Sequence, residues 1–66
     1  MNQDAFNMSI RKFLKTVGVN SQREIEHAVA SAVASGKAVD FYPAHMTLKV
    51  PGLALEVAFD GEIRLR

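Results

Sequence analysis

Few side chains in this 66-residue sequence could serve as metal ligands. The two histidines, His27 and His45, show no HxxxH or HExxH spacing, and the chain contains no cysteine. A metal site would then need carboxylates brought together from distant parts of the chain. We therefore interpret both histidines as surface residues and predict no metal site.

Nucleophilic catalysis and nucleotide binding have little more support. A catalytic serine needs a neighbouring base and an oxyanion hole, and no GxSxG turn occurs. The four glycines form neither a GxGxxG nor a GxxxxGKS/T loop. A chain of this size also has little room for a pocket that encloses a substrate. We expect no enzymatic activity, no catalytic residue and no cofactor.

Composition indicates one small globular domain over residues 1–66. Apolar residues make up 48% of the chain, which is too many for a disordered protein. The net charge of +1 argues against strong nonspecific binding to nucleic acid or to a membrane surface. No apolar run is long enough to span a bilayer, and the polar start Met1-Asn2-Gln3-Asp4 does not resemble a signal peptide. We expect a cytoplasmic protein.

Two amphipathic helices are predicted in the first half, at about residues 4–17 and 21–36. The first has an apolar stripe formed by Phe6, Ile10, Phe13, Leu14 and Val17, and Gly18 is placed to end it. The second has an apolar stripe formed by Ile25, Ala28, Val29, Ala32 and Val33. Ser21 and Glu24 have the spacing of a capping box at its start, and Gly36 is its expected end.

Alternating apolar residues then predict a three-stranded antiparallel meander at about residues 45–50, 53–58 and 62–66. Residues 38–44 are interpreted as a linker, because Pro43 disfavours a central strand. Pro51-Gly52 is the expected first loop, which places Leu48 opposite Leu55.

Phe59-Asp60-Gly61 is preferred as the second loop of this meander. That register pairs Val57 with Ile63, sets Glu56 opposite Arg64 and gives Gly61 a positive φ. The fold class is thus α+β, with both helices on one face of the sheet. The predicted core contains Phe13, Ile25, Val29, Leu48, Leu55 and Val57.

The outer strands of the predicted sheet leave open edges, which small proteins often cover by pairing. This favours a small interaction or dimerisation module, which forms a homodimer or binds a protein partner. Nucleic-acid binding is the alternative. Residues 13–29 resemble a helix-turn-helix, with a basic edge formed by Arg11, Lys12, Lys15 and Arg23. Against it, the interval from Gly18 to Ile25 is one residue longer than the usual glycine-to-apolar spacing of that motif, acids lie nearby, and no third helix is available.

Several stretches are similar to a family of small uncharacterised bacterial proteins, classed as a domain of unknown function. The similarity is carried by the run from Asp4 to Lys15, by Val17-Gly18-Val19 and by the run from Ser21 to Glu26. It continues through Ala32 to Lys37, Met46-Thr47-Leu48 and Asp60-Gly61-Glu62-Ile63. The resemblance implies a free-standing bacterial protein and no particular activity or site.

Overall fold

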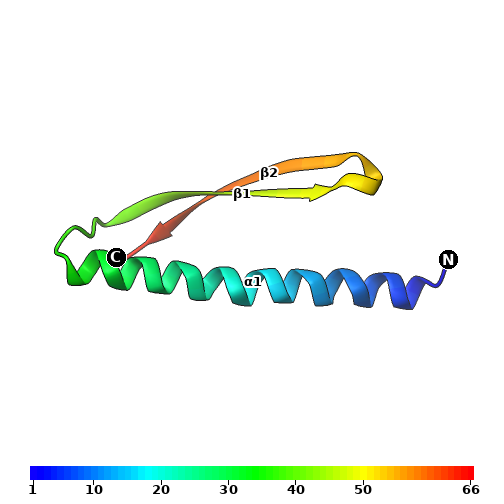
Figure 1. Cartoon of the computed structure of the whole chain (residues 1–66), viewed down its shortest axis with the longest axis horizontal. Helices are drawn as coiled ribbons and strands as arrows, with labels where there is room; N and C mark the ends of the chain where they lie inside the picture. Colours follow the sequence, from blue (N-terminus) through cyan, green and yellow to red (C-terminus); the bar gives the residue numbers. More distant parts are fainter.

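One long helix and one β-hairpin make up the fold in the computed structural model, which describes residues 1–66. Helix α1 spans Gln3–Ala34, strand β1 Phe41–Val50, the single 3₁₀ turn η1 Pro51–Leu53, and strand β2 Leu55–Arg64. The hairpin lies along α1, and the N-terminal end of α1 extends a little past the hairpin tip (Figure 1). The molecule is elongated, with extents of 52 × 20 × 18 Å.

The two predicted helices are one continuous helix, so that prediction is wrong. Gly18 lies within α1, and Ser21 does not cap a helix start. The apolar stripe explains the continuity, because Val17 and Ala28 lie on the same side of α1 with Ser21 between them. An internal glycine costs a helix only about 1 kcal/mol, whereas a break would leave several backbone groups without partners.

Both ends of α1 have well-formed caps. The Asn2 side chain accepts a hydrogen bond from the Ala5 amide at 3.0 Å. At the other end Gly36 has φ +72°, and the Lys37 amide donates to the Ala32 carbonyl at 2.9 Å. This is the Schellman arrangement, which favours glycine at that position. The predicted end at Gly36 is therefore confirmed, and the observed N-cap is Asn2.

The predicted three-stranded meander is replaced by a hairpin of two ten-residue strands. Strand β2 runs straight through Phe59-Asp60-Gly61, where a loop was expected, and Gly61 does not have a positive φ. Strand β1 begins at Phe41 and so includes part of the predicted linker. Pro43 is tolerated because both strands of a hairpin are edges, where a missing amide can face away from the partner strand.

The register differs from the prediction, although the alternation of faces is as expected. Leu48 pairs with Val57 rather than Leu55, and Glu56 pairs with Lys49 rather than Arg64. The side chains that share one face of the ribbon are almost all apolar: Tyr42, Ala44, Met46, Leu48, Val50, Leu55, Val57, Phe59, Gly61 and Ile63. An unbroken strand β2 preserves this alternation as well as the predicted loop does. It also pairs with β1 along the full length of both strands.

The hairpin turn is longer than the expected Pro51-Gly52 loop. Four residues, 51–54, connect the strands, and the Ala54 amide donates to the Pro51 carbonyl at 3.1 Å. Ala54 closes the turn at φ +51°, a conformation that is rare for a residue with a β-carbon. The turn therefore contains a small amount of backbone strain at Ala54.

A closed core is absent from the single chain, and none of its 66 residues is buried. Of the residues predicted to form the core, Val29, Leu48 and Val57 are half-buried, whereas Phe13, Ile25 and Leu55 are exposed. One helix cannot cover the apolar face of a two-stranded ribbon and also hide its own stripe. The predicted single-chain core is wrong for this reason.

Candidate interaction surface

A groove runs between α1 and β1 along most of the hairpin. Its three hollows follow one another along the strand, lined on the β1 side by residues 42–44, 44–46 and 46–49 in turn. On α1 they are lined by residues from Ile25–Ala32, Ser21–Ile25 and Phe13–Val17. We call this feature the α1–β1 groove. It is open to solvent along its whole length.

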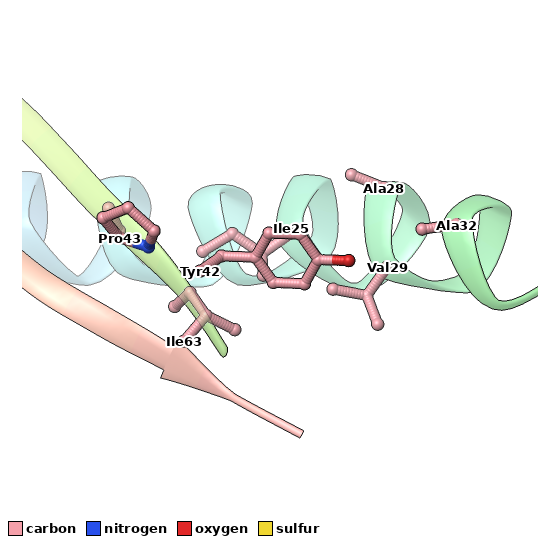
Figure 2. A pocket seen from close by; sticks show the side chains of 8 residues that line it. Ile25, Ala28, Val29, Ala32, Tyr42, Pro43 and Ile63 are labelled. Carbon is pink, nitrogen blue, oxygen red and sulfur yellow. The ribbon is translucent and has the colours of Figure 1, made fainter. Parts of the chain in front are cut away.

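The end of the α1–β1 groove nearest the chain's C-terminus is the most apolar part. Figure 2 shows Tyr42 and Ile63 of the hairpin beside Ile25 and Val29 of α1, with Ala28 and Ala32 beyond them. The hollow has a volume of about 250 Å³. The Tyr42 hydroxyl accepts a hydrogen bond from the Val39 amide at 3.0 Å. The other lining side chains are apolar, so this end of the groove suits a hydrophobic occupant.

Large apolar side chains are also uncovered at the N-terminal part of α1. The exposed fractions are 46% for Phe6, 41% for Ile10, 52% for Phe13 and 53% for Leu14. Phe13 and Leu14 also line the hollow of the α1–β1 groove beside Met46–Lys49. We call these four residues the N-terminal stripe. A contiguous apolar patch of this kind is typical of a protein–protein contact.

The outer face of the hairpin is polar and carries cross-strand ion pairs. Lys49 Nζ lies 3.7 Å from Glu56 Oε1, and His45 Nδ1 lies 2.6 Å from Asp60 Oδ1. All four side chains are at least two-thirds exposed, which limits the contribution of each pair to stability. The outer face is therefore polar, in contrast to the apolar inner face, and its His45 and Asp60 also border the middle hollow of the α1–β1 groove.

His45 and Asp60 form the one imidazole–carboxylate pair in the structure. Such a pair can orient an imidazole for proton transfer, and Ser21 and Glu24 line the same hollow. No hydrogen bond joins either residue to His45 or Asp60. No group of three or more histidine and carboxylate side chains is close enough together to hold a metal ion. The sequence did not indicate the pair, because its patterns place Asp60 in a loop.

The four basic residues of the nucleic-acid alternative are exposed on α1. Lys15 and Arg23 line one shallow hollow with Thr16, Val19 and Asn20, whereas Arg11 and Lys12 lie outside it. The turn of the expected helix-turn-helix is not formed, because residues 13–29 belong to one helix. The structural basis of that alternative is therefore lost.

No helix in the structure combines the length and the hydrophobicity that crossing a bilayer requires.

The chain belongs to a family of unknown function (DUF6494), whose model matches residues 1–66. This membership confirms the resemblance to a domain of unknown function that the sequence indicated. No curated protein and no solved structure matches the chain.

Proposed function

We propose that this protein is a small non-enzymatic module whose function is self-association, with the homodimer as its folded unit. The single observation that carries the proposal is the absence of any buried residue in a chain with 48% apolar composition. Chains fold because they remove apolar surface from water, and this one leaves too much of it exposed.

The exposed area gives the size of the missing contact. A compact folded chain of 7.2 kDa exposes about 4,100 Å², whereas this chain exposes 5942 Å². The excess is about 1,800 Å² per chain. Two chains that hide this excess from each other would bury roughly 3,600 Å² in total, which is within the range of obligate homodimers. An excess of this size supports a contact with a second copy of the chain.

Sedimentation equilibrium tests the proposal directly. The expected result is a mass twice the 7.2 kDa of one chain at micromolar concentration. A chain that is monomeric, fully folded and cooperative in its unfolding would contradict the proposal. A larger closed oligomer would retain self-association but would exclude the dimer as the folded unit.

A matched pair of substitutions identifies the surface involved. Leu14 and Val19 are both on α1 and have similar exposed fractions in the single chain, 53% and 44%. Only Leu14 belongs to the N-terminal stripe. Leu14→Asp should weaken association about a hundredfold or more, because an unpaired charge would enter an apolar contact. Val19→Asp introduces the same residue into the same helix and should leave the mass unchanged.

A further inference from the structure

We propose that the two copies associate with their α1 helices antiparallel, each placing its N-terminal stripe in the α1–β1 groove of the other. This inference rests on the proposed homodimer and specifies its arrangement. In it, Phe6, Ile10 and Phe13 of one copy contact Ala28 and Ala32 of the second. The arrangement is symmetric, so both grooves are filled in the same way.

Side-chain size along α1 is the first argument for the antiparallel direction. The large residues of the N-terminal stripe lie in the first half of the helix, whereas Ala28 and Ala32 lie in the second half. Interfaces pack well when large side chains face small ones. A parallel pair would place phenylalanines against phenylalanines at one end and leave the hollow beside the alanines empty. An antiparallel pair places the large residues at the start of each helix opposite Ala28 and Ala32 of the other.

Charge along α1 favours the same direction. In the first half Arg11, Lys12 and Lys15 outnumber the single acid, Asp4. In the second half the acids Glu24 and Glu26 outnumber the single base, Arg23. Antiparallel helices bring the basic half of one copy beside the acidic half of the other, and their dipoles also oppose each other favourably. A parallel pair would bring like charges together.

The position of the hairpin makes the arrangement possible. Because the hairpin lies along α1 but stops just short of its N-terminal end, the start of the helix projects from each copy (Figure 1). The α1–β1 groove is open near the other end of the helix, where Ala28 and Ala32 line it (Figure 2). Phe13 and Leu14 line the other end of the same groove. A second copy in the reverse direction therefore brings the projecting start of its helix to Ala28 and Ala32, while its Phe13 lies further along the same groove.

Distances between spin labels decide the direction. The chain has no native cysteine, so Gln3→Cys and Lys37→Cys can each be labelled at one position close to opposite ends of α1. The helix is about 48 Å long at the standard rise per residue. Antiparallel copies should give a distance of about 45–50 Å between the two labels at position 3. A mixture of the two labelled chains should give a much shorter distance, about 20 Å or less, between position 3 and position 37.

This experiment distinguishes a failure of the antiparallel arrangement from a failure of the homodimer itself. A short distance between the two labels at position 3 would overturn the antiparallel arrangement while leaving the homodimer intact. Long distances in both samples would also overturn it, because the helices would then lie apart. Labelled chains with no intermolecular distance, together with a monomeric mass, would overturn the proposed function itself.

Filling the groove from within tests the contact surface independently of the labels. Ala28→Phe would occupy the hollow that the stripe needs, and should raise the dissociation constant of the dimer about tenfold or more. Ala30→Phe is the matched control, because Ala30 lies on the opposite side of α1 and is exposed. It should leave the dissociation constant unchanged. Adding Phe13→Ala to Ala28→Phe should restore part of the lost affinity, and equal effects of the two phenylalanines would overturn the assignment of the groove.

Discussion

Single residues show how one sequence signal can have two structural readings. Gly18 and Gly36 are both plausible helix ends in the sequence, yet only Gly36 has a positive φ. The difference lies in the residues on the C-terminal side of each glycine. After Gly18 the apolar stripe continues in phase to Ala28, whereas after Gly36 the helix is not continued and strand β1 begins at Phe41. The local signal at Gly18 therefore carried less weight than the continuity of the stripe.

The two glycines are expected to respond to substitution in opposite directions. Gly18→Ala should stabilise the protein by about 0.5–1 kcal/mol, because alanine is the better helix former and no atom lies near the added β-carbon. Gly36→Ala should destabilise it by about 1–2 kcal/mol, since a β-carbon disfavours the left-handed conformation. Urea denaturation of the two variants measures both. A loss of stability in Gly18→Ala would argue for a helix end at that residue.

Elements could be predicted in kind better than in extent. The helical and alternating patterns correctly assigned most of the chain to helix or strand, and the sharing of one face by Met46, Leu48 and Val57 was correct. The number of elements was not, because Asp60-Gly61 is a favoured turn sequence and Ser21 with Glu24 matches a capping box. Both motifs depend on a few neighbouring residues. Neither indicates whether the helix or the strand continues through them.

Substitutions of Asn2, the observed N-cap, and of Ser21, the predicted one, test where α1 begins. Asn2→Ala should cost about 1 kcal/mol, because the Ala5 amide would lose the side-chain oxygen that accepts its hydrogen bond. Ser21→Ala should change stability by less than about 0.5 kcal/mol, since alanine is the better residue inside a helix. Helical content and thermal midpoint from circular dichroism report both effects. The reverse order, with Ser21→Ala the more harmful, would support a helix start at Ser21.

The whole molecule is where sequence reasoning had least to work with. Residues such as Phe13 and Leu55 were expected in one core because they lie on apolar faces, and an apolar face indicates burial without indicating by which chain. The helix forms one layer and the hairpin a second, and neither layer fully covers the apolar face of the other. The exposed apolar faces made the prediction of a single-chain core wrong, and the same exposure favours a core formed between chains. The predicted preference for self-association stays a prediction on that basis.

Coupled folding and association should make the thermal midpoint depend on protein concentration. When a folded dimer unfolds to two separate chains, each tenfold increase in concentration adds about 1.4 kcal/mol to the stability of the dimer. For an assembly of this size that corresponds to a rise of roughly 5 °C in the midpoint. Calorimetry over a hundredfold range of concentration measures the shift. Leu14→Asp, if it separates the chains, should lower both the midpoint and its dependence on concentration, whereas Val19→Asp should preserve that dependence. A midpoint that does not move with concentration would mean that the single chain folds alone, with its apolar faces exposed.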